Sequence, residues 1–361
     1  MESDLLLPTE AMRQWVADLW RAAGSCEQEA QLTADHLIGA NLAGHDSHGV
    51  VVVEQYVRAL LAGELRLNQR LSLVADTDTL LVVEGHQGMG QSMAFQTMQL
   101  AIERARRHGV AMVGLRHSHH IGRVGHYAEQ AMAASFASIH FTNVVGCPMV
   151  APHGGRQSRF GTNPFTVGLP RRDAPSILLD FASSAIALGK VRVAYNRKRQ
   201  VPVGVLIDHE GQPTLDPAVM YEKPLGALLP AAGHKGYALA VVCDLLGSAL
   251  FGGSTPHPRQ LALTGFYNNM LTIVFDPARF GASEPFEREA SAFIGYVKSS
   301  APRDPNSLIE MPGDSERRYR AQRVRVLPLD ANTVRGLDQA AQAVNALSGA
   351  ALPPASSLVA P

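Results

Sequence analysis

A strand–helix–strand pattern in the first third of the chain restricts the fold more than any other feature of the sequence. Thr79–Val83 is an apolar run typical of a β-strand, Ser92–Arg107 has apolar residues at helical spacing, and Val110–Leu115 is again an apolar run. Gly109 follows the predicted helix at the position where a residue with positive φ often ends one. A helix that crosses between two neighbouring strands predicts a parallel pair covered by that helix.

The same alternation continues along the chain. Helices are expected at about His126–Ala134, Gly236–Leu250 and Glu287–Lys298, and strands at Ala137–Thr142, Ile177–Phe181, Val203–Ile207 and Leu271–Phe275. We therefore predict an α/β fold with a mixed sheet flanked by helices. The Gly88-Met89-Gly90 turn matches the glycine pattern of dinucleotide-binding turns only in part, because Met93 stands where the third glycine belongs, so we interpret it as a tight turn.

The N-terminal segment is predicted to be helical. Apolar residues recur at helical spacing after Thr9, and Ser25 with Gln28 fits a capping box that opens a second helix to about Leu42. We expect residues 1–75 to form a helical segment that packs with residues 285–350. Residues 76–284 are expected to form an α/β domain that carries the ligand sites, and the Pro/Ser/Ala-rich residues 351–361 to be frayed.

Charge and cysteine content exclude several classes of protein. The chain has 32 Lys and Arg against 32 Asp and Glu, so no net charge attracts a nucleic acid. Its three cysteines are far apart and never form a C-x-x-C pair, which excludes a disulfide framework and a zinc ribbon; they are Cys26, Cys147 and Cys243.

Export and membrane insertion are not expected. The start, Met1-Glu2-Ser3-Asp4, is acidic where a secretory leader would be basic. The longest apolar stretch, Ala238–Gly253, contains Asp244 and falls short of the ~20 residues that a membrane span needs. We therefore expect a soluble, cytoplasmic protein without a membrane partner.

The segment Gly44–Gly49 places His45, Asp46, Ser47 and His48 between two glycines. Imidazoles titrate near neutral pH, so this composition suits proton transfer. A serine-hydrolase elbow needs Gly-x-Ser-x-Gly, whereas Gly44 stands three residues before Ser47. The alternative is a helix that ends at Gly44 and is followed by polar capping residues.

Three histidines crowd the end of the strand predicted at Val110–Leu115, at positions 117, 119 and 120. They include no H-E-x-x-H and no carboxylate, so we predict no metal site. Strand C-termini in α/β sheets are where ligands bind, which favours a ligand-facing loop.

Three further segments have the chemistry of anion sites. His153–Arg156 and Arg159–Pro164 combine glycines with guanidinium groups, and Gly233–Gly236 opens an apolar helix with Lys235 in its first turn. Tight turns with surface arginines, and an ordinary helix start with a solvated lysine, are the alternatives. Pro312–Glu316 is a weaker candidate, for which a plain surface turn is the preferred interpretation.

Taken together, these segments resemble the malate/L-lactate dehydrogenase family of NAD(P)-dependent oxidoreductases. The family's blocks occur in order over roughly residues 10–330: Asp46-Ser47-His48-Gly49-Val50, Ser118-His119-His120-Ile121-Gly122, Val150-Ala151-Pro152, Gly161-Thr162-Asn163-Pro164, Leu179-Asp180-Phe181-Ala182-Ser183, Gly233-His234-Lys235-Gly236-Tyr237 and Pro312-Gly313. The resemblance implies a fold other than the usual Rossmann dinucleotide-binding fold, and a homodimer.

One departure concerns the substrate carboxylate. The family commonly carries an arginine at the position of Val52, so we expect another cation, Arg123, Arg156 or Arg159, to bind the carboxylate.

The resemblance also implies roles for individual residues. His48 is the expected acid/base, Asp180 orients catalytic groups, and His120 faces the substrate. Residues that line the cofactor are expected to be His48, Gly122, Arg123, Val124, Leu178, Leu179, Asp180, Phe181, Ala182, His234, Lys235, Met270, Gly313, Asp314, Ser315 and Glu316.

The predicted function is hydride transfer between NAD(P)H and a 2-oxo acid, which gives a 2-hydroxy acid. Aromatic 2-oxo acids are included. Alternatives are a cyclic-imine or ureidoglycolate-type oxidoreductase of the same family, a hydrolase that uses Ser47 and His48, and a ligand-binding protein without catalysis.

Overall fold

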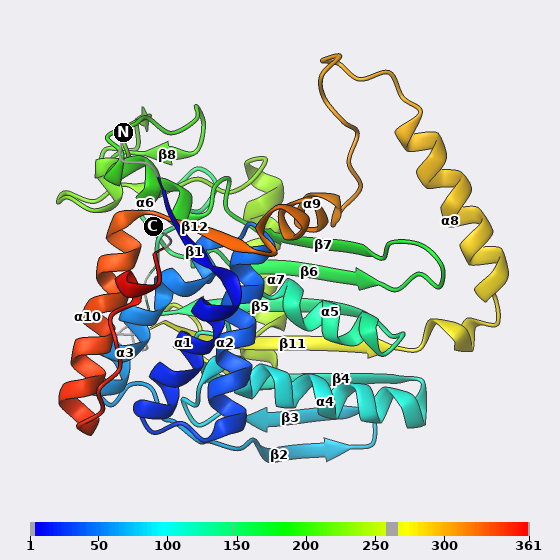
Figure 1. The fold of residues 1–361 in the computed structure, drawn as a ribbon. Coiled ribbons are helices and arrows are strands. Elements are labelled where there is room, and N and C mark those ends of the chain that lie inside the picture. Colours follow the sequence, from blue (N-terminus) through cyan, green and yellow to red (C-terminus); the bar gives the residue numbers. More distant parts are fainter. Residues whose placement is uncertain (1–3, 147, 258–265, 360–361) are drawn as a thin grey trace.

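A mixed seven-stranded sheet forms the centre of the fold in the computed structural model, which describes residues 4–146, 148–257 and 266–359 (Figure 1). Its strands, in spatial order, are β2 (Ser72–Thr77), β3 (Leu80–Glu84), β4 (Val110–His119), β11 (Tyr267–Phe275), β5 (Ala137–Val145), β6 (Pro164–Leu169) and β7 (Ile177–Ala182). Among the described strands of this sheet, β3 and β4 pair in parallel and all other neighbours are antiparallel. The predicted mixed sheet is confirmed. The predictions made for Cys147 and for Met1–Ser3 lie outside the described residues.

The predicted strand–helix–strand unit is β3, α4 (Gly90–His108) and β4. Gly109 follows α4 with φ 90° and ends it, as predicted. A Cβ on Gly90 would lie 2.1 Å from the carbonyl oxygen of His120, so only glycine lets the start of α4 approach the end of β4 this closely. Met93 is fully buried in the apolar core between α4 and the sheet.

Helices cover both faces of the sheet. Figure 1 shows α4 and α5 (Gly125–Ala133) in front of it and α7 (His234–Leu246) behind it. The predicted end of α7 at Leu250 is wrong by four residues. A Cβ on Gly247 would lie 2.6 Å from the carbonyl oxygen of Phe141, and the chain leaves the helix at this close approach.

A helical layer stands beside the sheet. It contains α1 (Thr9–Ala22), α2 (Glu27–Leu42), α3 (Val53–Leu61) and α10 (Ala331–Ser348), and the antiparallel strands β1 (Leu5–Pro8) and β12 (Val326–Leu329). These elements share one apolar core, centred on large side chains such as Trp20. The predicted capping box is wrong, because the Ser25 hydroxyl donates to the Glu29 carboxylate (2.8 Å) and α2 begins at Glu27 without a side-chain cap.

The segments after residue 280 differ in their packing. α10 packs against α1 and α3, whereas α8 (Ser283–Lys298) has no buried residue and extends away from the body of the molecule (Figure 1). The described part of the tail is ordered instead of frayed. Ala355 is fully buried in a 3₁₀ turn, Ala355–Leu358, and the Trp15 Nε1–H donates to the Pro353 carbonyl (2.8 Å).

Two smaller parts complete the fold. β8 (Leu206–Ile207), β9 (Pro213–Thr214) and β10 (Ala227–Leu228) form a small antiparallel sheet near α6 (Leu188–Asn196), and α9 (Asp314–Arg323) precedes β12. The strand predicted from Val203 begins only at Leu206, because Val203 is exposed and Gly204 turns the chain with φ 79°. No helix among the described residues is long and apolar enough to cross a membrane.

Candidate functional site

A short turn after α2 carries His48. Gly44, with φ 81°, ends the helical region, and Asp46–His48 forms a single 3₁₀ turn. The Asn41 side chain braces this turn: its amide donates to the Asp46 carboxylate (2.7 Å) and its oxygen accepts the Val50 N–H (2.9 Å). Arg323 of α9 donates to the same Asp46 carboxylate (2.7 Å). These contacts fix the backbone that presents His48.

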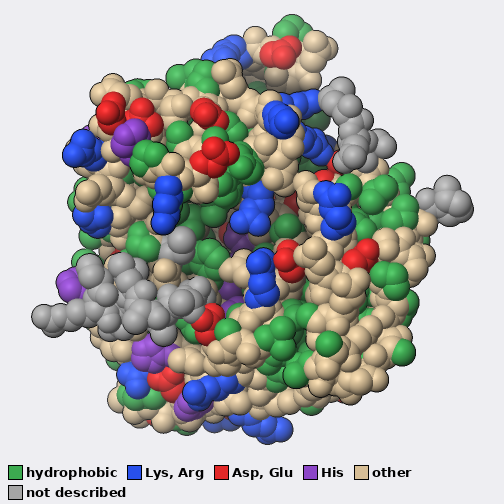
Figure 2. Space-filling model, turned by 90° about the vertical axis from the view of Figure 1, so that its left-hand side faces the viewer, with side chains coloured by type: hydrophobic (Ala, Val, Ile, Leu, Met, Phe, Trp, Pro, Cys, Tyr) green, Lys and Arg blue, Asp and Glu red, His purple; other side chains and the backbone are tan. Residues whose placement is uncertain are grey.

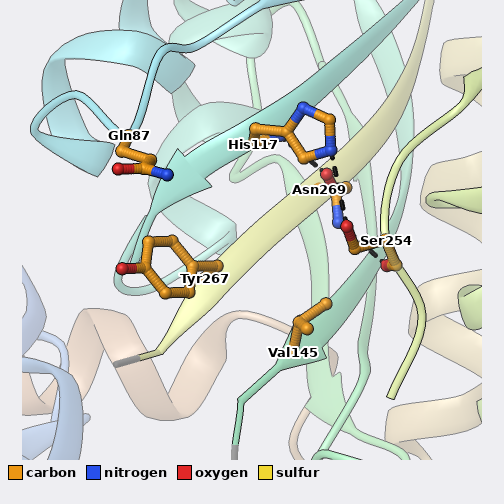
Figure 3. Close-up of a pocket in the computed structure, with 6 residues that line it drawn as sticks. All are labelled: Gln87, His117, Val145, Ser254, Tyr267 and Asn269. Carbon is orange, nitrogen blue, oxygen red and sulfur yellow. Dashed lines mark hydrogen bonds between the residues drawn. The ribbon is translucent and has the colours of Figure 1, made fainter. Parts of the chain in front are cut away.

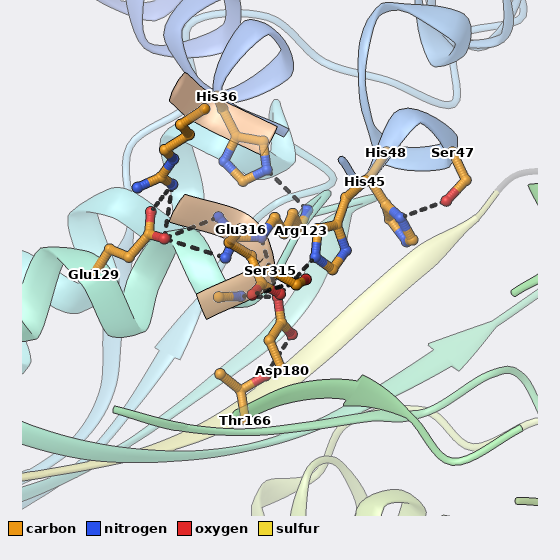
Figure 4. Close-up of polar contacts among 12 residues, drawn as sticks. His36, His45, Ser47, His48, Arg123, Glu129, Thr166, Asp180, Ser315 and Glu316 are labelled. Atoms are coloured by element: carbon orange, nitrogen blue, oxygen red, sulfur yellow. Dashed lines mark hydrogen bonds and ion pairs between the residues drawn. The ribbon is translucent and has the colours of Figure 1, made fainter. Parts of the chain in front are cut away.

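His48 and His120 lie together although 72 positions separate them in the sequence. Their ring centroids are 5.7 Å apart and the ring planes differ by 22°. His120 follows directly after β4, so the end of this strand and the 3₁₀ turn build one site, as the sequence predicted for the strand end. The Ser47 hydroxyl lies 3.0 Å from His48 Nδ1 (Figure 4).

Both imidazoles are neutral at pH 7. Burial lowers the pKa of His48 to about 4, and the positive fields of His45 and Arg123 act in the same direction, while the Asp180 carboxylate opposes them. Burial also lowers the pKa of His120 well below its usual range. The expectation that His48 titrates near neutrality is therefore wrong for the unliganded protein, because the site removes water from the ring.

Asp180, on β7, holds the chain that follows His120. Its carboxylate accepts the Gly125 N–H (3.0 Å) and the Thr166 hydroxyl (2.9 Å), and Arg123 Nε lies 3.1 Å away. The Arg123 side chain is only 2% exposed and also pairs with Glu129 (3.1 Å). Figure 4 shows this polar group beside the His45–His48 turn. Asp180 thus positions a loop, and its role in orienting catalytic groups stays a prediction.

The predicted role of Arg123 in binding the substrate carboxylate does not fit this environment. Its guanidinium is buried and faces two carboxylates of its own chain, Asp180 and Glu129. Arg159 is exposed and donates to the Ser158 carbonyl (2.9 Å) and to Gln157 within its own loop. Neither arginine contacts His48 or His120 among the described residues.

Two predicted cofactor segments lie side by side. The Leu178 N–H donates to the Pro312 carbonyl (3.1 Å), and Gly313 packs against Leu178. Glu316 reaches the turn that carries His48, because its carboxylate lies 3.2 Å from His45 Nε2. Burial acts to raise the pKa of Asp314, but hydrogen bonds from the Met311 N–H and from basic side chains lower it to about 2. The start of β7 therefore adjoins the start of α9, which in turn contacts the His48 turn.

The start of α7 adjoins the end of β7. The Ala231 N–H donates to the Ser183 carbonyl (2.8 Å), and Gly233, with φ 62°, precedes the first helical residue. His234 and Lys235 are exposed there. The molecular face in Figure 2 is hollowed near its middle, and Lys, Arg and His side chains gather around the hollow. Exposed cations at a helix N-terminus fit a phosphate ligand.

Met270 lies in β11 and is fully buried in the apolar core that α4 and the sheet share. Its place beside the cofactor stays a prediction. Several residues of the site escaped the sequence analysis, namely Asn41, Tyr56, Gln91, Glu129, Thr166, Arg320 and Arg323. No local pattern distinguishes them, and most of them act through a partner that is remote in the sequence.

A small cavity of about 40 Å³ lies elsewhere along the ends of β4 and β11 (Figure 3). It is lined by Gln87, His117, Val145, Ser254, Tyr267 and Asn269. Ligand pockets measure about 300–1,000 Å³, so this cavity suits a water molecule and not an organic acid. His117 pairs with Glu84, since its Nδ1 lies 3.0 Å from the Glu84 carboxylate. The partner of His120 is Tyr56 instead.

No three His, Cys, Asp or Glu side chains of the described chain are grouped so as to hold a metal ion. His117 contacts Glu84, whereas His119 and His120 both lie against Tyr56. Independence from metal stays a prediction.

Comparisons with known proteins agree on one group of enzymes. A family model described as malate/L-lactate dehydrogenase matches residues 7–338. Hydroxycarboxylate dehydrogenase B of Escherichia coli strain K12 is 47% identical to this chain, in an alignment that covers 95% of this chain and 96% of the relative's length. The structure of sulfolactate dehydrogenase from Methanocaldococcus jannaschii has a TM-score of 0.84 at 30% identity and covers 96% of this chain and 98% of its own. Δ1-piperideine-2-carboxylate reductase from Pseudomonas syringae has a TM-score of 0.80 at 26% identity over 95% of this chain and its full length.

Proposed function

The chain belongs to the malate/L-lactate dehydrogenase family, and from that premise we propose that it is an NAD(P)-dependent 2-hydroxycarboxylate dehydrogenase. It reduces 2-oxo acids, aromatic ones included, when reduced cofactor is abundant. The observation that carries this proposal is the pair of neutral imidazoles, His48 and His120, 5.7 Å apart at the end of a sheet strand. The mixed sheet supports a cofactor site unlike the Rossmann arrangement.

In the proposed reaction the two imidazoles have different roles. The nicotinamide cofactor, when bound, supplies the hydride. His48 exchanges the proton of the hydroxyl group: as the neutral base it takes this proton during oxidation, and as the acid it returns it during reduction. His120 donates a hydrogen bond to an oxygen of the substrate. Asp180 keeps the loop after His120 in place through Gly125 and Arg123.

For the cofactor phosphates we propose the start of α7. Replacing His234 and Lys235 by alanine is expected to raise the KM for NAD(P)H more than the KM for the oxo acid, because free N–H groups and the side-chain charge converge there. Steady-state kinetics with each substrate varied in turn measure both constants. A matched control is Lys198→Ala, which removes an exposed lysine that follows α6. An unchanged KM for the cofactor would exclude this region.

The proposed activity is tested by absorbance at the NAD(P)H band across a panel of 2-oxo acids, with NADH and NADPH in parallel. Turnover of a 2-oxo acid supports the proposal. Turnover of Δ1-piperideine-2-carboxylate alone would favour the cyclic-imine alternative, which the structural similarity to that reductase keeps as the second candidate. Cofactor binding without any oxidation would identify a binding protein. Ser47 and His48 do contact each other, but the family membership favours redox chemistry over hydrolysis.

We also propose that the protein is a homodimer. Two helices expose apolar side chains: α7 exposes Leu245 (54%) and α8 exposes Phe293 (58%) and Tyr296 (77%). The α8 side chains have no cover within the described part of the chain, and a partner that covers such apolar surface is typical of an interface. Light scattering is expected to give twice the monomer mass of 38.7 kDa, and Phe293→Asp to lower it toward the monomer. A monomeric wild-type protein would contradict the proposal.

A further inference from the structure

We propose that Tyr56 is a positioning residue for the reaction, because its hydroxyl holds His120 in the tautomer that carries the ring proton on Nε2. This inference rests on the proposed function of the site, since it concerns how His120 meets the substrate. It adds a residue that lies on neither the catalytic turn nor the strand end.

The hydrogen bonds around the Tyr56 hydroxyl set the direction of its proton. Tyr56, on α3, is 1% exposed, and its oxygen lies 2.6 Å from His120 Nδ1. Gln91 Nε2 lies 3.0 Å from the same oxygen and donates to it. The phenol has one proton, and two acceptors on His120 lie within its reach, Nδ1 at 2.6 Å and the carbonyl oxygen at 3.4 Å. Because Gln91 already donates to the phenol oxygen and the contact with Nδ1 is much the shorter of the two, we place the proton on that contact. His120 Nδ1 is then the acceptor, and the ring proton resides on Nε2.

The protonation states of Tyr56 and His120 do not change over the working pH range, so the hydrogen bond between them keeps its direction. Burial raises the pKa of Tyr56 well above its usual range, so the phenol keeps its proton. Burial lowers the pKa of His120 well below its usual range, so the ring stays neutral and Nδ1 keeps its lone pair. The pair is therefore a fixed donor and a fixed acceptor.

The consequence for the site is a permanent donor at His120 Nε2. Within the described residues this nitrogen has no hydrogen-bond partner, and the ring lies almost parallel to that of His48. A neutral imidazole in this tautomer can polarise a substrate oxygen by donating a hydrogen bond, but it has no extra proton to give away. Tyr56 thus assigns hydrogen bonding to His120 and leaves proton transfer to His48.

Tyr56→Phe removes the hydroxyl and retains the ring that packs against Trp20 and His119. Without the phenol proton, His120 can adopt the other tautomer and turn a lone pair toward the substrate. We expect kcat/KM for the oxo acid to fall about tenfold, the effect of one lost hydrogen bond at a buried site, while the affinity for the cofactor is unchanged. The matched control is Tyr127→Phe, since the Tyr127 hydroxyl is equally buried but donates to the Ile121 carbonyl (2.5 Å) and not to a histidine.

The deciding measurement is the tautomer itself, read from ¹⁵N–¹H correlation spectra of ¹⁵N-histidine-labelled protein, with His120 assigned by His120→Gln. The expected wild-type spectrum has a protonated Nε2 and an unprotonated Nδ1, and Tyr56→Phe alters this pattern whereas Tyr127→Phe does not. A wild-type His120 that is protonated on Nδ1, or a pattern that survives Tyr56→Phe, would overturn the proposal. Because the spectrum is read without turnover, it distinguishes this failure from failure of the proposed activity.

Discussion

Replacing His48 by alanine is expected to lower kcat by about 10²–10⁴-fold, the usual contribution of a general acid or base. The side chain lies at the end of a braced turn and faces the site through one ring nitrogen, while Ser47 contacts the other (3.0 Å). The turn itself is held by Asn41 and Arg323, which do not depend on the imidazole. Steady-state kinetics measure the loss, and fluorescence titration with NAD(P)H should give an affinity close to that of the wild type.

The pH profile provides the control for this prediction. Reduction needs protonated His48, and its pKa is lowered to about 4, so kcat/KM for the oxo acid should fall about tenfold per pH unit above about pH 5. Oxidation needs the neutral ring and should be nearly independent of pH over the same range. The pH dependence of reduction should disappear in His48→Ala. A folded variant that retains more than a tenth of the wild-type kcat would exclude His48 as the acid, and His120 would be tested next.

Arg123→Met is expected to lower the free energy of unfolding by about 3–5 kcal/mol, because removing one partner of a buried ion pair leaves the other charge uncompensated. Asp180 would lose its cation while its side chain stays 6% exposed. Methionine fills much of the same volume, so the loss reflects charge more than packing. Urea denaturation followed by circular dichroism measures the change.

The chain offers a matched control in Arg320. This arginine pairs with the same Glu129 (2.7 Å) but is 40% exposed, so Arg320→Met should cost less than about 1 kcal/mol. If instead Arg123→Met is as stable as Arg320→Met and raises the KM for the oxo acid, then Arg123 binds the substrate carboxylate, as the sequence first suggested.

The sequence predicted those parts of the fold whose contacts are local. The unit of β3, α4 and β4 was predicted because its apolar residues form a continuous run in each strand and recur at helical spacing between them. Gly109 marks the end of the helix. The strand β2 was missed because all six of its residues are exposed and carry no alternating pattern. The pairing of β1 with β12 joins residues more than 300 positions apart, and no pattern within either strand indicates it.

The candidate site was predictable where residue types alone indicate its chemistry. Crowded histidines pointed to His48 and His120, and the structure brings their rings together. The partners of charged groups were not predictable: Arg123 was expected to meet a ligand, but it meets Asp180, which lies on a distant strand. The lowered pKa of His48 depends on how much water the folded site excludes, which no sequence pattern reports.

The contact between Arg323 and Asp46 has a consequence for the order in which the protein is made. The two residues are 277 positions apart, and ribosomes add about 5–20 residues per second, so Arg323 emerges on the order of 15–55 s after Asp46. During that interval the turn that carries His48 lacks one of its two braces. The nascent chain can therefore pair β3 with β4 under α4 early, but the central strand β11 and the second brace of the His48 turn follow only late in translation.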